Sequence, residues 1–362
     1  MRTMIERTPL GMSLRTSKPA QSTVYCIVPA YRAGATIVKV VEATLPFADC
    51  IIVVDDACPE HSGAVARAAF VTNAAVQVIE RERNGGVGAA MKTGIASALA
   101  QGADIIVKID ADGQMDSTYI DTIRAIFIED ASLVCIKGNR FFDPSVITRM
   151  PKIRFLGNAA LSLFAKCASG YWNTIDPTNG YIAFNANLLR LLPWQSFADS
   201  YFFEISVLCE LGLRRLPILE LEMPTIYNGA PSSLSIGRVL LEFPRRLFAL
   251  TMRRLLVQYF VFDINLGTVY GVLGLLLTLF GVAFGGFEWT ESLRTGVARQ
   301  TGTVMIAVLT FLMGFQLLLN ALMYDVQFSG KTQHELRVKA GDRAAKDLEL
   351  LQSREYLNSK RD

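Results

Sequence analysis

Residues Asp104 to Gln114 read DIIVKIDADGQ, and this segment says more about the fold than any other part of the chain. Its apolar first half predicts a short buried strand over 104–109, and its second half predicts a turn that carries two carboxylates. Four further β-rich runs occupy residues 24–28, 50–54, 76–79 and 133–136, each followed by turn residues and a small-residue helical stretch. Strands that alternate with helices in this way predict an α/β domain with a mostly parallel, Rossmann-like sheet buried on both faces.

Candidate ligand-binding residues follow three of these runs, at the edge where an open parallel sheet binds its ligands. They are Pro29 and Tyr31 after the first run, Asp55 and Asp56 after the second, and Asp110, Asp112 and Gln114 after the run 104–109. The two carboxylates and the amide of the last group could direct three hard oxygen ligands at one Mg²⁺ or Mn²⁺ ion, whose coordination substrate phosphates would complete. A DxD motif alone is more often turn chemistry or a helix cap, so its place at a strand end is what favours a metal site.

Two other segments of this half admit two interpretations. Asp55 and Asp56 either cap the helix that follows them or accept hydrogen bonds from a nucleotide base or ribose. The segment 84–90 reads NGGVGAA, and its Gly86 and Gly88 leave room for a nucleotide to approach the backbone closely. It lacks the Walker A lysine and the dinucleotide glycine spacing, so neither of those phosphate loops is predicted.

The second half of the chain is less regular up to residue 227, with helices predicted over 152–168 and near 202–211. The segment 235–263 then places five arginines among apolar residues, at spacings that put them on one side of a helix. They are Arg238, Arg245, Arg246, Arg253 and Arg254. This pattern is typical either of an ordinary amphipathic surface helix or of a basic helix that lies on anionic lipid, and the sequence that follows favours the second.

Two uncharged runs, 264–287 and 300–324, are each longer than the roughly 20 residues that span a bilayer. They predict a transmembrane hairpin, because a buried hairpin of a soluble protein would need a very large surrounding core. Arginines precede the first run and basic residues follow the second, whereas the connector 288–299 is short and mixed in charge. The positive-inside rule therefore predicts a multi-pass inner-membrane protein with the α/β domain and both termini in the cytoplasm.

Composition excludes several other classes of protein. The 362 residues are 51% hydrophobic, and the mean hydropathy of +0.31 indicates membrane segments in addition to a soluble core. Lys and Arg number 36 against 33 Asp and Glu, which argues against a nucleic-acid binder. The chain has six cysteines without a CxxC pair and only two histidines, so the sequence predicts no zinc site. It shows no disulfide framework either, which fits a soluble part that faces a reducing compartment. The N-terminus lacks the apolar run of a signal peptide.

Together and in this order, the motifs resemble the family 2 glycosyltransferases of the GT-A fold. Within that family they are similar to the polyprenyl-phosphate glycosyltransferases, such as dolichyl-phosphate mannose synthases and bactoprenol glucosyltransferases. The resemblance runs from about residue 24 to 324, and its motifs are VPAY at 28–31, VDD at 54–56, the glycine spacing from 84 to 94, DADGQ at 110–114, GNR at 138–140 and DPTNGY at 176–181. The chain departs from the family at Val87, where lysine is frequent, and at Asn179, in place of the usual serine.

The resemblance implies inverting transfer of a sugar from a UDP- or GDP-linked donor to polyprenyl phosphate, for cell-envelope glycan or glycoprotein synthesis. It implies that the nucleotide contacts Pro29, Tyr31, Asp55, Asp56, Gly86, Gly88 and Asp110, and that Mg²⁺ or Mn²⁺ binds Asp110, Asp112 and Gln114. Arg140 and the Asp176 loop would face the lipid phosphate, and Asp176 and Glu204 are candidate bases or orienting groups. Simpler alternatives are a loop turn for Asp176, a solvated helix carboxylate for Glu204 and a surface ion pair with Asp143 for Arg140.

Other functions remain as alternatives. A processive polysaccharide synthase is disfavoured, because the QxxRW motif and the many spans that such proteins share are missing. A glycosyltransferase that uses another membrane glycolipid or glycan, and a catalytically silent nucleotide-sugar binding protein, both stay open, although the complete DADGQ motif speaks against the latter. We expect each chain to consist of five segments: a flexible arm (1–23), a GT-A domain (24–234), amphipathic juxtamembrane helices (235–263), a transmembrane hairpin (264–324) and a polar cytoplasmic tail (325–362). We also expect the protein to form a homo-oligomer.

Overall fold

The computed structural model of the chain describes residues 22–141, 152–223 and 236–327. Most of the predicted arm (residues 1–21 of 1–23) and most of the predicted tail (residues 328–362 of 325–362) lie outside these ranges. The six cysteines all fall within these ranges and are all free.

The centre of the molecule is a seven-stranded sheet with the strand order β3-β2-β1-β4-β6-β5-β7. Its strands are β1 (Val24–Ala30), β2 (Cys50–Asp55), β3 (Val76–Glu80), β4 (Ile105–Lys108), β5 (Cys135–Asn139), β6 (Ile182–Asn185) and β7 (Ile218–Glu222). The five predicted strands are all present, and the first four form one parallel block. Strand β6 pairs antiparallel with both β4 and β5, and β5 pairs parallel with β7. The sheet is therefore mixed but mostly parallel, and β6 and β7 are the two strands that the sequence did not reveal.

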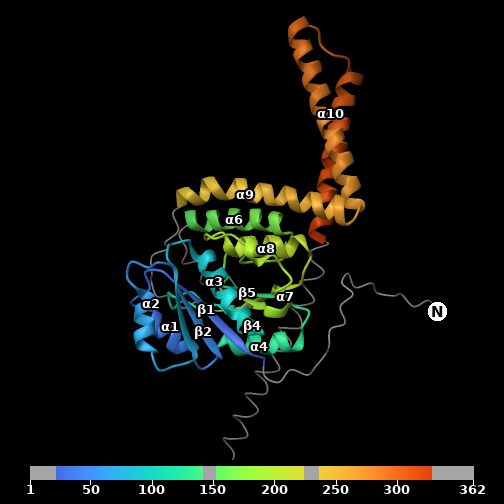
Figure 1. The fold of residues 1–362 in the computed structure, drawn as a ribbon. Helices are drawn as coiled ribbons and strands as arrows, with labels where there is room; N and C mark the ends of the chain where they lie inside the picture. The colour runs from blue at the N-terminus through green and yellow to red at the C-terminus, as the bar shows by residue number, and fades with distance from the viewer. Residues whose placement is uncertain (1–21, 142–151, 224–235, 328–362) are drawn as a thin grey trace, which may run out of the picture.

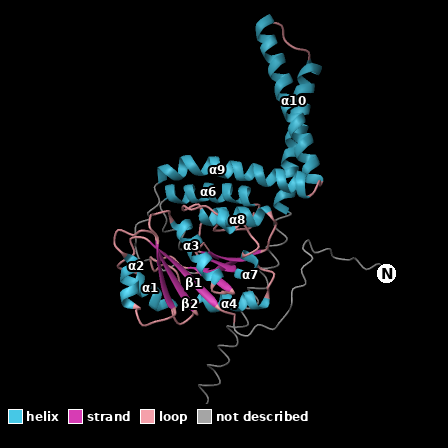
Figure 2. Cartoon of the chain, in the orientation of Figure 1, coloured by secondary structure: helices cyan, strands magenta, loops and turns pink. Residues whose placement is uncertain are grey.

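The helices cover both faces of this sheet and then continue away from it (Figure 1, Figure 2). They are α1 (Ile37–Thr44), α2 (Ser62–Ala69), α3 (Val87–Ala100), α4 (Tyr119–Glu129), α6 (Lys152–Ser169), α7 (Ala186–Leu189), α8 (Phe203–Leu213), α9 (Ile236–Leu256), the π-helical turn η2 (Val257–Phe262), α10 (Leu266–Thr295) and the last helix, Thr301–Gln327, besides the short 3₁₀ turn η1 (Trp194–Ser196). The predicted helices over 152–168 and near 202–211 correspond to α6 and α8.

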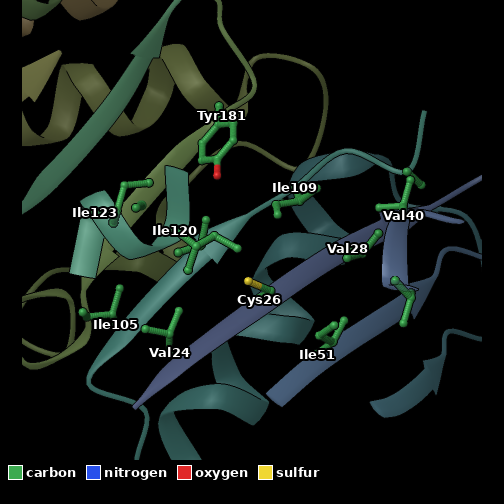
Figure 3. Close-up of a cluster of buried hydrophobic side chains, with 14 of the residues drawn as sticks. Val24, Cys26, Val28, Val40, Ile51, Ile105, Ile109, Ile120, Ile123 and Tyr181 are labelled. Carbon is green, nitrogen blue, oxygen red and sulfur yellow. The ribbon is translucent and has the colours of Figure 1, made fainter. Parts of the chain in front are cut away.

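Alternate residues of the central strands serve two separate cores, as the period of a β-strand requires. On β1, Cys26 and Val28 pack with α1 and α4, whereas Ile27 packs with α3 and α8 on the opposite face. Figure 3 shows the first of these cores, in which Ile120 and Ile123 of α4 lie over β1 and β4. A third, smaller core joins α6, α8 and α9, so that α9 forms an outer layer on the α8 side.

The last two helices project from this body as a hairpin (Figure 1). Both are long and apolar enough to cross a membrane, and only 22% and 6% of their most apolar windows are buried. Because core helices of a soluble protein would be mostly buried, this exposure favours the transmembrane interpretation over the buried hairpin. Helix α10 extends through Thr295 into the predicted connector, and the last helix continues past Tyr324 through Asp325 to Gln327.

The base of the hairpin is fastened to the α/β domain by a buried ion pair. Arg254 of α9 donates to both carboxylate oxygens of Asp325, at 2.8 and 2.9 Å. Asp325 also accepts hydrogen bonds from the indole of Trp172 at 2.7 Å and from the hydroxyl of Tyr259 at 2.8 Å. Arg254 is only 3% exposed, so the expectation that it shares a lipid-facing side with the other arginines is wrong, whereas Arg245, Arg246 and Arg253 are exposed.

Candidate active site

The polar residues predicted to act together come from loops at one edge of the sheet. The parallel strands β1, β2, β4 and β5 all end there. Because β6 runs the opposite way, the loop 175–181 that leads into it arrives at the same edge. The antiparallel strand therefore brings the Asp176 loop beside the Asp110 turn, although the two lie far apart in the sequence.

The DADGQ turn has a fixed backbone and two carboxylates that lie near each other. Gly113 adopts a left-handed φ of 73°, and the Thr36 hydroxyl donates to the carbonyl oxygen of Ala111 at 2.6 Å. Although Asp112 lies at the surface, neighbouring protein atoms partly desolvate its carboxylate, and this desolvation, followed by the charge of Asp110, raises the pKa of Asp112. A 3.0 Å hydrogen bond from the Gln114 N–H opposes that shift. The turn chemistry foreseen as the simpler alternative is thus present, and it leaves the Asp112 side chain exposed.

The donor set of this turn suits a hard divalent cation. Within the described ranges, no three His, Cys, Asp or Glu side chains gather as a complete ion site. Two carboxylates and one amide are the sparse oxygen ligands with which Mg²⁺ or Mn²⁺ binds when phosphates complete its coordination. Asp110, Asp112 and Gln114 therefore fit the predicted ion chemically.

A buried lysine that the sequence analysis did not single out lies beneath this turn. Lys108 is 1% exposed, and its ammonium group pairs with Asp110 and with Glu204 of α8, the latter at 3.0 Å. It also donates to the carbonyl oxygen of Gly180 at 3.2 Å. Burial alone would lower the pKa of Lys108, but the two carboxylates outweigh that effect and raise it. Glu204 is buried in this pair, so the interpretation of Glu204 as a solvated helix carboxylate is wrong.

A second buried lysine, Lys137 of β5, was also missed. It donates to the carbonyl oxygen of Asn179, one residue before the carbonyl that Lys108 binds. Burial lowers the pKa of Lys137, and the nearby charges of Glu204 and Asp176 only partly oppose that shift. The one sequence signal for both lysines is a charge at the end of an apolar strand, which is equally typical of a side chain that emerges into solvent.

Arg140 and Asp176 form a forked ion pair across the same edge. The Arg140 Nε and one terminal nitrogen donate to the two oxygens of Asp176, at 2.8 and 3.2 Å. Asp176 is fully buried, whereas the Arg140 side chain is 35% exposed. Asp143, the partner considered in the sequence analysis, lies outside the described residues. Because both Asp176 oxygens accept hydrogen bonds from Arg140, the carboxylate orients the guanidinium group.

The two aspartates that end β2 both have structural partners. Asp55 accepts hydrogen bonds from the N–H groups of Cys58 and Gly63, each at 2.6 Å, and so caps the start of α2. Asp56 accepts from the N–H groups of Gly85 and Gly86 and pairs with Arg81. The Asp55 carboxylate thus binds the first turn of α2, which begins at Ser62 with His61 at the N-cap position, whereas Asp56 binds the segment before α3. A nucleotide contact of either residue remains a prediction.

The glycine segment before α3 is packed against another loop. A Cβ at Gly88 would collide with the carbonyl oxygen of Ala198, and one at Gly86 would lie 2.8 Å from that of Asp199. The Ala89 N–H also donates to the Asp199 carbonyl at 2.9 Å. These glycines therefore allow two loops to meet, and their contact with a nucleotide stays untested, as does that of Pro29 in β1. Tyr31, which follows β1, is 45% exposed at the same edge, where Arg32 stacks on its ring.

Comparison with known proteins gives consistent matches. Residues 25–191 match the family model described as glycosyl transferase family 2. The UDP-N-acetylglucosamine–dolichyl-phosphate N-acetylglucosaminyltransferase of Methanococcus voltae is 31% identical over 222 residues, which cover 58% of this chain and 88% of that protein. The undecaprenyl-phosphate mannosyltransferase of Micrococcus luteus is 28% identical, covering 43% and 63% respectively. The polyprenol monophosphomannose synthase of Mycolicibacterium smegmatis is 27% identical, covering 54% and 74%.

Proposed function

The chain belongs to glycosyltransferase family 2, and from that premise we propose that it transfers a sugar from a nucleotide-sugar donor to polyprenyl phosphate at a membrane surface. The observation that carries the proposal is the meeting of the DADGQ turn and the Arg140–Asp176 pair at one edge of the sheet, in a chain that continues into an apolar hairpin. The named relatives, which act on dolichyl phosphate, undecaprenyl phosphate and a polyprenol, support the same acceptor class.

The reaction needs little acid–base chemistry. An oxygen of the acceptor phosphate is already anionic at neutral pH and attacks the anomeric carbon of the sugar in line. The bond from that carbon to the diphosphate oxygen breaks, the nucleoside diphosphate leaves, and the configuration at the anomeric carbon inverts. Positioning of the two substrates therefore supplies most of the rate enhancement, and a general base is not required.

Each half of the site has a separate task in this reaction. Asp110, Asp112 and Gln114 would hold Mg²⁺ or Mn²⁺, which when bound neutralises the charge of the leaving diphosphate. Arg140 suits the acceptor phosphate, because a guanidinium group binds phosphate oxygens in a forked arrangement. Asp176 orients Arg140, and the base role considered for Asp176 and Glu204 is replaced by a positioning role.

The hairpin and the basic helix support a location of this chemistry at the cytoplasmic face of the inner membrane. The exposed arginines of α9, Arg245, Arg246 and Arg253, would lie at the lipid headgroups, with the connector 288–299 on the opposite side. A single cysteine introduced at Ser292 should react with an impermeant thiol reagent only from outside the cell. Labelling of that position only from the inside would reverse the proposed topology.

The function is tested with the purified full-length protein. It is incubated with a panel of UDP- and GDP-sugars, with and without undecaprenyl or dolichyl phosphate, and the lipid product is identified by mass. We expect a polyprenyl-phosphate monosaccharide that forms only when the lipid phosphate is present. Donor hydrolysis alone, or a product on a lipid without a phosphate, would contradict the proposal.

A further inference from the structure

Three charged side chains lie side by side across four neighbouring strands, on a face of the sheet that is otherwise apolar. We call these residues, Lys108, Lys137 and Glu220, the charged row. In the strand register, Lys108 of β4 and Lys137 of β5 both lie opposite Ile182 of β6, and Lys137 lies opposite Glu220 of β7. Residues in one register row point to the same face of a sheet, which here is the face covered by α8. Lys108, Lys137 and Glu220 are 1%, 0% and 8% exposed.

Each member of this charged row holds the backbone of the Asp176 loop. Glu220 accepts hydrogen bonds from the N–H of Ile175 at 2.9 Å and from that of Asp176 at 3.3 Å. Lys137 donates to the Asn179 carbonyl, and Lys108 to the Gly180 carbonyl. The row therefore grips the loop at both ends, on either side of the Asp176 carboxylate that orients Arg140.

Lys108 differs from the other two members, because it also binds the opposite half of the site. Its ammonium group pairs with Asp110, and its remaining partner is Glu204. Gly180 is pressed against the same carboxylate, since a Cβ there would collide with the second oxygen of Asp110. Asp110 thus lies between a lysine and the loop that the lysine binds, with part of its carboxylate still exposed.

We propose that the charged row is a positioning platform for the acceptor loop, and that Lys108 is the positioning residue that locks this loop to the donor-side carboxylate Asp110. The proposal rests on the proposed function, because it assigns donor and acceptor to the two halves of that site. Lys137 fixes the acceptor loop alone. Lys108 fixes the loop and Asp110 together, and Glu204 balances its charge.

A purely structural role for the row is the competing explanation. Loss of one partner of a buried ion pair destabilises a protein strongly, whereas replacement of both partners by apolar side chains is often neutral. Loss of activity after a single substitution would therefore not separate positioning from folding. The two lysines provide the separation, because both are fully buried and both bind a carbonyl of the same loop, but only Lys108 pairs with Asp110.

The test compares Lys108→Met, Lys137→Met and the double variant Lys108→Met/Glu204→Met in the full-length protein. The donor side is measured without turnover, as the affinity for UDP and for GDP in the presence of Mn²⁺. The acceptor side is measured as the KM for polyprenyl phosphate, and thermal unfolding monitors the fold.

We expect Lys137→Met to raise the acceptor KM about tenfold and to leave nucleotide affinity within about twofold of the wild type. Lys108→Met should weaken nucleotide affinity about tenfold and lower kcat about 10²-fold, the loss that a misplacement of about 1 Å can cause. The double variant should unfold at nearly the wild-type temperature and remain as inactive as Lys108→Met.

Two results would overturn the inference: equal nucleotide affinity in the two single variants, or recovery of activity in the double variant. If Lys108→Met fails to fold, the double variant alone decides between positioning and structure. The proposed function fails separately, when the wild type binds a nucleotide but forms no lipid-linked sugar. In that case the contrast in nucleotide affinity still tests the tie between Lys108 and Asp110.

Discussion

At the base of the hairpin, the carboxylate of Asp325 receives four hydrogen bonds, two from Arg254 and one each from Trp172 and Tyr259. At the edge of the sheet, the Lys108 side chain is buried as deeply as that of Arg254, but the side chain of its partner Asp110 is 33% exposed. The two clusters use the same chemistry and differ in what remains open to solvent. A cluster whose polar atoms are all satisfied inside the protein holds two parts of the chain together, whereas a cluster with a partly exposed carboxylate has capacity left for a ligand.

The largest effect is expected at Asp112, next to the cluster of Lys108, Asp110 and Glu204, which we call the open cluster. Asp112→Asn keeps the shape of the turn but removes a negative ligand from the predicted cation, so turnover should fall about 10³-fold or more. Product formation by mass and the unfolding temperature are measured together. Asp121→Asn, at an exposed carboxylate of α4, is the matched control and should be silent. Near-normal activity of Asp112→Asn, or full activity in chelator, would remove the metal from the mechanism.

Substitutions in the cluster of Asp325 with Arg254, Trp172 and Tyr259, which we call the closed cluster, should lower the stability of the protein. Asp325→Ala leaves Arg254 buried without its anion and should destabilise the protein by about 3–5 kcal/mol, which is the usual cost of breaking a buried pair. Unfolding in detergent by heat or denaturant measures the loss. Arg254→Met/Asp325→Leu removes both charges and should recover much of it. A double variant as unstable as the single one would show that the pair itself, rather than its unpaired remnant, stabilises the junction.

A smaller effect is expected at the rim of the open cluster. Arg140→Lys keeps the positive charge but loses the forked contact with Asp176 that orients the guanidinium group toward the acceptor phosphate, so the KM for polyprenyl phosphate should rise about tenfold. Nucleotide affinity should stay unchanged, which separate titrations of donor and acceptor will reveal. An equal loss on both sides would return Arg140 to a purely structural role.

The smallest effect is expected at an exposed ion pair, which serves as the reference for the buried pairs of both clusters. Arg67 and Glu80 form an ion pair with side chains 54% and 49% exposed. Arg67→Ala should change the free energy of unfolding by less than about 1 kcal/mol, because water screens an exposed pair. A loss as large as that of Asp325→Ala would mean that burial does not explain the difference between the clusters.

The sequence predicted those parts of the molecule that depend on local pattern. Apolar runs and turn residues located five strands, and uncharged length located the two long helices. Strands β6 and β7 escaped because each is a short run whose partners lie far away in the chain. The antiparallel direction of β6, which brings the Asp176 loop to the Asp110 turn, has no local signature.

Among the charged residues, too, those with neighbours in sequence were predicted and those with distant partners were not. The DADGQ turn was identified because its ligands are neighbours in sequence. Lys108, Glu204 and Asp325 were overlooked or misjudged, because a charge within or beside an apolar segment can be exposed or paired. Their partners lie tens of residues away, as with Gly180 for Lys108 and Arg254 for Asp325. Only the fold decides between the two outcomes.

The junction at Asp325 also bears on how the proposed enzyme would meet a lipid acceptor. The chain leaves the catalytic domain through α9, enters the hairpin and returns to Trp172 of the same domain, so the domain is attached to the hairpin at two points. A domain held by one linker can swivel, whereas one held at two points keeps a fixed height and tilt above the bilayer. Encounter with a membrane-embedded acceptor is then a two-dimensional search, and the rate should follow the mole fraction of acceptor in the surrounding bilayer rather than its concentration in the bulk suspension.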